Sequence, residues 1–236
     1  MKEEGVRINK YLSEIGFCSR RKADALIDQH KVTINDKIPE LGTKVMPGDI
    51  VKVEGKLVGQ NEVTPVYIAL NKPVGIVCTT DTRREKDNII DYINYPSRIF
   101  PIGRLDKASE GLILLTNDGD IVNKILRASN HHEKEYIVTV NKPINADFIK
   151  QMSNGVPILG TVTNKCFVEA LTEKTFRIIL TQGLNRQIRR MCEHFGFRVR
   201  KLKRVRIMNI ELDTPRGKWR ELNPKEIHAL YKLLDE

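Results

Sequence analysis

Short apolar runs separated by Gly and Asn dominate the chain after residue 66, and they restrict the folds open to it. Four runs have the length and the β-branched or aromatic content typical of strands: residues 112–115, 136–140, 166–171 and 176–180. Helices are expected between them, near residues 120–127 and 145–153. Because strands and helices alternate irregularly, the sequence predicts an α+β fold with a largely antiparallel mixed sheet, not a doubly wound parallel one.

The first sixty residues show a different pattern, in which two short helices precede several strands. Apolar residues recur at helical spacing near the start: Ile8, Tyr11, Leu12 and Ile15. Ser19 is a suitable N-cap for a second helix. The first turn of that helix would carry Arg20, Arg21 and Lys22, although the helix dipole disfavours cations there. This placement favours a phosphate-binding role, and three incidental surface cations are the alternative.

Residues 58–66 separate these two patterns. They are polar, contain Gly59 and Pro65, and lack periodicity, which indicates a linker. We therefore expect one small domain over residues 1–57 and a larger domain over residues 67–236. No apolar run approaches the ~20 residues of a membrane helix, and the first residues lack the apolar stretch of a secretory signal. A cytoplasmic protein that does not bind membranes is the resulting expectation.

Positive charge is concentrated in one short segment. The net charge of the chain is +10, and residues 181–206 hold nine basic side chains and a single acidic one, Glu193. Most of the excess therefore falls in about one-ninth of the chain. Such a concentration indicates a phosphate-binding surface, and a basic face that serves only solubility is the alternative.

Within this segment, residues 185–196 have the pattern of an amphipathic helix with Asn185 as its N-cap and Gly196 at its end. Arg186, Arg189 and Arg190 lie in its first two turns, where a carboxylate or phosphate partner would offset the unfavourable dipole. Apolar residues from 199 to 207 then suggest a strand. Basic side chains on and beside this strand would follow an RNA backbone: Arg198, Arg200, Lys201, Lys203, Arg204 and Arg206.

Sequence signatures of cofactors and metals are missing. No glycine-rich dinucleotide or P-loop motif is present, and the adjacent His131, His132 and Glu133 do not have metal-ligand spacing. The four cysteines stand far apart without a C-x-x-C pair, so reduced and mostly buried thiols are expected. We expect a protein without a cofactor, a metal or a disulfide framework.

Asp106 is the carboxylate most suited to chemistry. It lies in a glycine-flanked loop just before the apolar run at residues 112–115. A carboxylate on a loop that is anchored by a buried strand can be presented rigidly to a cleft. Judged by its spacing alone, Asp106 would more simply be a turn residue or a cap.

Two family resemblances add to this interpretation. The run RINKYLSEIGFCSRRKADALI, followed by VTIND and VMPGDIV, resembles the RNA-binding domain named after ribosomal protein S-four, over about residues 5–55. It departs from that family at His30 and Asp36, where glycine is usual. The segments NKPVG, FPIGRLDKASEGLILLTNDGD, KEYIVTV, QGLNRQIRRM and KLKRVRI resemble the RsuA/RluB/RluE/RluF family of ribosomal RNA pseudouridine synthases, and most closely its large-subunit branch.

The second resemblance implies roles for individual residues. Asp106 matches the catalytic aspartate, Arg189 the arginine that pairs with it, and Tyr136 the tyrosine that stacks on the target uracil. Arg104 resembles the arginine that fills the space left by the flipped base. Leu202 and Ile207 resemble the walls of the uracil pocket. For each of these side chains an ordinary structural role is the alternative: a phosphate contact for Arg189, a salt bridge for Arg104, and core packing for Tyr136, Leu202 and Ile207.

The resemblance also implies an activity. We expect a monomeric, cofactor-free isomerase that converts a specific uridine of 23S ribosomal RNA to pseudouridine, within a pre-ribosome or on free RNA. A transfer RNA anticodon or small-subunit ribosomal RNA is the alternative substrate. A non-enzymatic RNA-binding or ribosome-assembly factor would have the same charge distribution, and an RNA methyltransferase would require a cofactor cradle that the sequence lacks.

Overall fold

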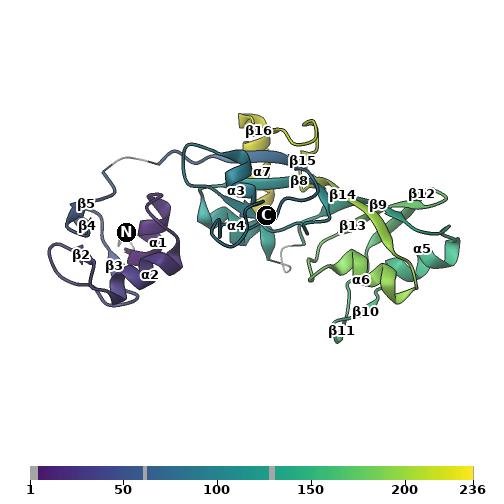
Figure 1. The fold of residues 1–236 in the computed structure, drawn as a ribbon, viewed down its shortest axis with the longest axis horizontal. Coiled ribbons are helices and arrows are strands. Elements are labelled where there is room, and N and C mark those ends of the chain that lie inside the picture. Colours follow the sequence, from purple (N-terminus) through teal and green to yellow (C-terminus); the bar gives the residue numbers. More distant parts are fainter. Residues whose placement is uncertain (1–4, 61–62, 128–130, 236) are drawn as a thin grey trace. The chain divides into compact units, whose positions relative to one another are not determined.

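The computed structural model describes residues 5–60, 63–127 and 131–235, so residues 61 and 62 of the expected linker lie outside it (Figure 1). The chain divides into two compact units. One consists of Met1–Val66 with Tyr95–Arg98 and Asn117–Gly119, and the other of the remaining residues. No helix in the described ranges has the length and apolar content that crossing a membrane requires.

The smaller unit contains the expected pair of helices followed by strands. Its elements are β1 (Val6–Arg7), α1 (Ile8–Glu14), α2 (Arg20–Asp28), β2 (Val32–Ile34), β3 (Lys44–Val45), β4 (Val51–Val53) and β5 (Lys56–Leu57). The prediction of Ser19 as N-cap of α2 is confirmed, since its side chain accepts a hydrogen bond from the Lys22 backbone N–H at 3.2 Å. Helices and strands enclose a core that includes Ile8, Leu12 and Val32.

Two turns of this unit keep a left-handed backbone without glycine. His30 has φ +54° and Asp36 has φ +62°. At both positions the S-four RNA-binding family, which this segment resembles, usually has glycine. Asn35 precedes Asp36 with φ +49°, and its side chain bonds Asp49 and the Ile50 N–H at 2.8 and 2.9 Å. Because Asn and Asp tolerate this conformation better than other residues, the turn geometry survives the substitution.

The larger unit is built on one sheet. Its strands are β6 (Tyr67–Lys72), β7 (Phe100–Ile102), β8 (Glu110–Thr116), β9 (Lys134–Val140), β12 (Phe167–Thr172), β13 (Thr175–Leu180), β14 (Val199–Ile207), β15 (Ile210–Glu211) and β16 (Trp219–Glu221). The order is β12-β13-β9-β14-β8-β6-β16, with β15 beside β14 and β7 beside β8. Among these pairings only that of β14 with β8 is parallel, so the predicted α+β fold with a largely antiparallel sheet is confirmed.

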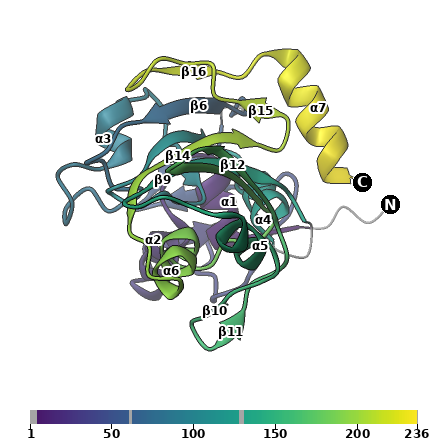
Figure 2. The same cartoon turned by 90° about the vertical axis from the view of Figure 1, so that its right-hand side faces the viewer.

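Helices cover this sheet in two places (Figures 1 and 2). They are α3 (Ile89–Ile93), α4 (Gly119–Leu126), α5 (Ala146–Ser153), α6 (Gln187–His194) and α7 (Pro224–Asp235), and a small hairpin joins β10 (Pro157–Ile158) to β11 (Thr161–Val162). Helices α5 and α6 pack on one core, which contains Phe148, Met191 and Leu202. Helices α4 and α7 pack on a second core with Ile121, Leu230 and Ile207. Strand β14 therefore contributes to both.

Strands β8 and β14 approach each other unusually closely at Gly111. A Cβ atom added there would lie 2.2 Å from the carbonyl oxygen and 2.7 Å from the amide nitrogen of Arg204, and the φ of Gly111 is +107°. Only glycine provides both the space and this backbone conformation. The parallel pairing of Arg204 with Gly111 and of Lys203 with Glu110 depends on it.

We predict that Gly111→Ala destabilises the larger unit by about 3 kcal/mol, because the new methyl group meets backbone atoms and the φ is unfavourable for alanine. Urea unfolding measures the effect. Gly183→Ala is the matched control, since a Cβ atom there meets no atom within 4 Å, its φ is not positive, and it lies in the same unit. Equal midpoints for the two variants would contradict the packing argument.

Candidate active site

Asp106 lies in the loop between β7 and β8, and several contacts fix that loop. The Ser109 N–H donates to the Asp106 carbonyl at 3.0 Å, and the Gly75 N–H donates to the Lys107 carbonyl at 2.8 Å. The buried Leu105 donates its N–H to the sulfur of Cys78 at 3.4 Å. The carboxylate is thus presented from a loop whose backbone is bonded both to itself and to the chain after β6.

Arg189 of α6 faces this loop, and its guanidinium Nε lies 3.4 Å from Oδ2 of Asp106. The Arg189 side chain is only 10% exposed, whereas that of Asp106 is 34% exposed. Nη2 of Arg189 also donates to the Ala108 carbonyl at 3.1 Å and to the Ser109 hydroxyl at 3.0 Å. The buried guanidinium of Arg189 therefore fixes the loop through these contacts, while the carboxylate of Asp106 stays partly accessible to solvent.

The ion pair is held by charge attraction more than by an aligned hydrogen bond. Nε of Arg189 is buried and has no hydrogen-bond partner of good geometry, although Asp106 lies within ion-pair distance. Both oxygens of Asp106 thus retain capacity to accept or attack. The structure brings together the two residues that the sequence predicted to pair.

The start of α6 differs from the expectation. The N-cap is Arg186, with φ +51° and no capping hydrogen bond from its side chain, so the prediction of Asn185 as N-cap is wrong. Asn185 instead accepts hydrogen bonds from Arg190, at 3.0 Å through its carbonyl and 3.3 Å through its side chain. The side chain of Arg190 thus bonds the residue before the N-cap, and Asn185 and Arg186 are both exposed.

Two lysines of this unit are buried, and one of them lies near Asp106. Lys72 is 0% exposed and donates to the carbonyls of Pro73 and Ile76 at 2.9 and 2.8 Å. Burial lowers the pKa of Lys72, an effect that Cys78 and Asp106 partly oppose. Lys134 is also buried, and burial together with the charge of Arg204 lowers its pKa to about 8. Of the two, Lys72 is the one whose charge interacts with Asp106.

Arg204 does not fit the RNA-binding role that the sequence suggested. It is 3% exposed, and its Nε donates to the Leu112 carbonyl at 2.7 Å, so its side chain cannot reach a phosphate in this conformation. Its guanidinium carbon lies 6.0 Å from the ring centroid of Tyr136, within the range of a cation–π contact. Arg204 thus links half-buried Tyr136 to β8.

Arg206 is a second correction to the predicted RNA surface. Its Nη2 lies 2.8 Å from Glu133 and its Nε 3.0 Å from Glu135, so two carboxylates neutralise its charge. The position on β14 was predicted well, but the acidic partners come from β9 and the residues before it. A pattern of basic residues along one strand does not reveal such cross-strand pairing.

The remaining predicted RNA contacts lie at the surface. Exposed side chains are Arg104 of the Asp106 loop; Arg20, Arg21 and Lys22 of the smaller unit; and Asn185, Arg186, Arg198, Arg200 and Lys201 of the larger one. Arg190 and Lys203 are half-buried. Exposed donors of the basic segment thus lie just before α6 and at the start of β14, with half-buried Arg190 on the helix between them.

A pocket of about 260 Å³ opens beside the Asp106 loop. Leu202 and Ala108 line it together with basic residues of β14. That Leu202 forms a wall of a uracil pocket stays a prediction. Ile207 lies elsewhere: it is buried in the core with Ile210 and Leu112 and acts there as a packing residue.

Other residues of this region escaped the sequence analysis. Glu110 and Arg216 line the pocket, and Lys72 lies in the field of Asp106. Glu110 and Lys72 belong to segments that had been recognised, SEGL and NKPVG, but a buried charge has no signature in a single sequence. Within the described ranges, no group of three or more His, Cys, Asp or Glu side chains gathers as a metal site.

Comparison with known proteins agrees with this geometry. A family model described as RNA pseudouridylate synthase matches residues 66–194, and one described as S4 domain matches residues 6–51. The chain belongs to the RNA pseudouridine synthases and is an RNA isomerase with an S4 domain at its N-terminal end. The family resemblance expected from the sequence motifs is thereby confirmed.

Individual relatives are similar over nearly the whole chain. The dual-specificity RNA pseudouridine synthase RluF of Escherichia coli is 59% identical over 99% of this chain and 81% of its own length. The ribosomal large subunit pseudouridine synthase B of Bacillus subtilis is 35% identical over 97% of both chains. A crystal structure of a pseudouridylate synthase, 29% identical, covers 95% of this chain and 99% of its own with a TM-score of 0.70.

The buried ammonium of Lys134 generates a prediction about pH. Its pKa falls from 10.5 unfolded to about 8 folded, so between these values the unfolded state binds more protons and stability rises with pH. Below pH 8 the charged lysine destabilises the fold by about 3 kcal/mol. Lys134→Met is therefore expected to be more stable than the wild type near neutral pH, with a difference that shrinks toward pH 10.5.

Denaturant unfolding of both proteins across this pH range measures that difference. His132, whose pKa burial and the charge of Lys134 lower below its usual value, is neutral in both proteins above pH 8 and does not disturb the comparison there. A difference in the free energy of unfolding that stays constant with pH would show that Lys134 keeps its ordinary pKa.

Proposed function

We propose that this enzyme converts a specific uridine of 23S ribosomal RNA to pseudouridine. The similarity to RluF of Escherichia coli and to the large-subunit synthase of Bacillus subtilis supports this target class. The observation that supports the chemistry is the ion pair of Asp106 with buried Arg189, on a loop whose Ala108 lines a pocket. A uridine of a transfer RNA anticodon or of small-subunit ribosomal RNA is the alternative substrate.

The reaction breaks the bond between uracil nitrogen 1 and the ribose, turns the base, and joins carbon 5 to the same ribose carbon. A proton leaves carbon 5 and a proton is gained at nitrogen 1, so no electrons are exchanged with another molecule. Asp106 would act as the ionised carboxylate beside the ribose, either as nucleophile at the anomeric carbon or as base at the neighbouring carbon. Its exposed oxygens fit both roles.

Arg189 would keep Asp106 charged and correctly placed during this reaction. Enclosing a carboxylate with substrate removes water and favours its protonated form, and a fixed cation opposes that effect. Since Arg189 also bonds Ala108 and Ser109, it holds the loop as well as the charge. These contacts support a positioning role for Arg189.

The target base has to leave its stack before Asp106 reaches the sugar. Arg104, exposed two residues before Asp106, would fill the vacated space with its planar guanidinium. Tyr136 would stack on the uracil and is our candidate for removing the carbon 5 proton, and Leu202 would line the base pocket. Contact of Tyr136 with Arg204 supports a fixed ring orientation.

RNA would be bound by both parts of the chain. We propose domain boundaries at residues 1–57 and 67–236, joined by residues 58–66, and a monomeric enzyme. Arg20, Arg21 and Lys22 are exposed in the first turn of α2, as expected for contacts of the smaller domain with phosphates. A purely RNA-binding factor would not need the pairing of Asp106 with Arg189, so this ion pair favours catalysis.

The target is tested by incubating the purified protein with transcripts of 23S and 16S ribosomal RNA and of transfer RNAs, followed by mapping of pseudouridine. We expect one modified position in 23S ribosomal RNA. Modification only of 16S or transfer RNA would overturn the proposed target, and absence of pseudouridine from ribosomal and transfer RNA, including assembly intermediates, would overturn the activity.

We predict that Asp106→Asn abolishes isomerisation and leaves RNA affinity within about threefold, a change below ~1 kcal/mol. Arg189 keeps its bonds to Ala108 and Ser109, so the loop stays in place without the charge. Release of the carbon 5 proton measures turnover. Asp81→Asn, an exposed position, is the control, and appreciable turnover by the Asp106 variant would count against its catalytic role.

Binding by the basic strand gives another prediction. Arg200→Ala and Lys203→Ala are each expected to weaken RNA binding and to reduce the slope of log affinity against log salt by roughly one. Arg206→Ala is the matched control because Glu133 and Glu135 already neutralise that side chain. Slopes that match the wild type in the first two variants would show that this strand does not face RNA.

A further inference from the structure

The loop between β15 and β16 brings Arg216 to the pocket beside Asp106. Nε of Arg216 lies 3.5 Å from Oε2 of Glu110, and Nζ of Lys201 lies 3.1 Å from the other oxygen of the same carboxylate. The Glu110 side chain is 8% exposed, whereas those of Arg216 and Lys201 are each 63% exposed. One buried anion thus holds two cations that remain open to solvent.

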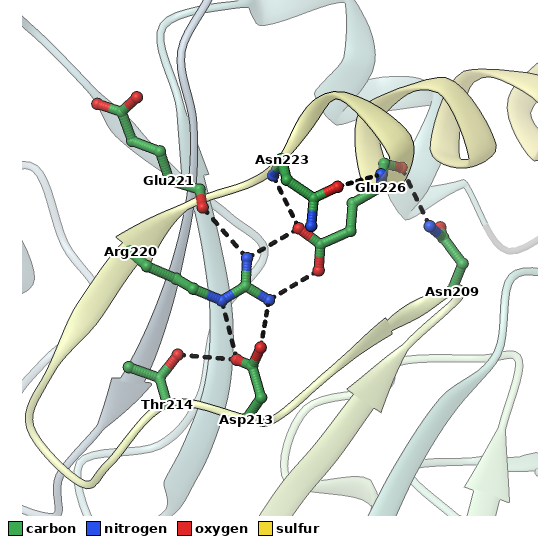
Figure 3. A network of polar contacts seen from close by, with 7 residues as sticks. All are labelled: Asn209, Asp213, Thr214, Arg220, Glu221, Asn223 and Glu226. Carbon is green, nitrogen blue, oxygen red and sulfur yellow. Dashed lines mark hydrogen bonds and ion pairs between the residues drawn. The ribbon is translucent and has the colours of Figure 1, made fainter.

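A polar network fixes the base of this loop (Figure 3). The Arg220 guanidinium donates to Asp213 at 2.9 and 2.8 Å and to Glu226 at 2.8 and 2.7 Å. Its hydrogen bonds lower the pKa of both carboxyl groups, so the network stays ionised around neutral pH. Asp213 lies in the loop two residues after β15 and Arg220 lies on β16, so the two sides of the loop are held together and anchored to α7 through Glu226.

The tip of the loop is fixed as well. The side chain of Asn71 donates to the Thr214 carbonyl at 2.7 Å, and the Asn71 carbonyl accepts from the Gly217 N–H at 2.8 Å. The Tyr92 hydroxyl donates to the Gly217 carbonyl at 3.0 Å. Backbone on both sides of Arg216 is thus held, and the position from which its side chain extends is defined.

The charge of the pocket favours an anionic ligand. Arg200, Lys201 and Arg216 line it against the single carboxylate of Glu110, so positive charge is in excess. A guanidinium that is bound through Nε retains its Nη donors, which form the edge that suits phosphate oxygens. The carboxylate therefore orients the arginine without using all of its donors.

The pocket also lies close enough to Asp106 to meet a phosphate next to the target ribose. Ala108 forms part of its wall and is two residues from Asp106, so their Cα atoms are at most about 7 Å apart. A ribose placed at Asp106 has a phosphate on either side, and one of these would fall within reach of the pocket.

We propose that Arg216 binds a backbone phosphate next to the target nucleotide, and that Glu110 is a positioning residue that orients Arg216 and Lys201 before the RNA arrives. This inference rests on the proposed function. Side chains ordered in advance lose less conformational freedom on binding, so the contact would increase both affinity and the accuracy with which the ribose is placed.

Arg216→Ala tests the contact against Lys218→Ala, a charge-matched control in the same loop that lies outside the pocket. Binding to an RNA stem-loop that contains the target uridine is measured from about 50 to about 200 mM salt. We expect the Arg216 variant to bind about fivefold more weakly, with the salt slope lower by about one, and the Lys218 variant to change less than half as much. Equal effects of the two variants would overturn the contact.

Glu110→Gln tests the positioning role. The substitution removes one negative charge, so RNA affinity is expected to stay equal or increase. We expect kcat to fall about tenfold, because Arg216 and Lys201 lose the carboxylate that orients them both. A purely structural role would lower both together or neither. Unchanged kcat in a folded variant would overturn the positioning role.

The double variant Glu110→Gln/Arg216→Ala separates the two residues further. If Glu110 acts through Arg216 and Lys201, kcat of the double variant falls by less than the product of the two single effects, whereas independent effects would multiply. Turnover by the wild-type enzyme in the same assay distinguishes a failure of the proposed function from a failure of the proposed role of Glu110. Inactive wild type would overturn the proposed function, and active wild type with multiplying effects would overturn only the coupling of Glu110 to Arg216.

Discussion

The close contact of β8 with β14 at Gly111 is the constraint on which the active site depends. It is the single parallel pairing in the described sheet, and it places the loop before β8 beside the helix that precedes β14. Asp106 lies on that loop and Arg189 on that helix, so the ion pair follows from the strand order. A side chain at position 111 would separate the strands and with them the two charges.

Charge is distributed by depth around this contact. Lys72, Lys134 and Arg204 are buried and donate to backbone carbonyls, so in this conformation they do not bind ligands directly. Exposed cations such as Arg200 lie along the surface and are free to meet phosphate. Lysine and arginine thus have two roles here: the buried ones bond to the backbone, and the exposed ones are available to phosphate.

Local pattern predicted most of the fold, because helical spacing and alternating strands are properties of neighbouring residues. It missed β7, β16 and α7. Of these, β16 depends on pairing with β6, which lies far away in the chain, whereas β7 pairs with the next strand, β8. Family motifs predicted the pairing of Asp106 with Arg189. Neither source revealed that Arg204 is buried, that Arg206 meets two carboxylates, or that Arg216 reaches Glu110, since each depends on pairing between segments far apart in the chain.

Strand β14 connects the two hydrophobic cores of the larger unit. Leu202 packs in one core of the larger unit and Ile207 in the other, so neither core is complete while this strand is displaced. Loss of either core would therefore propagate along β14 to the other, and the larger unit is expected to melt as a single cooperative block. The smaller unit has a separate core, and the residues that form it belong to neither core of the larger unit.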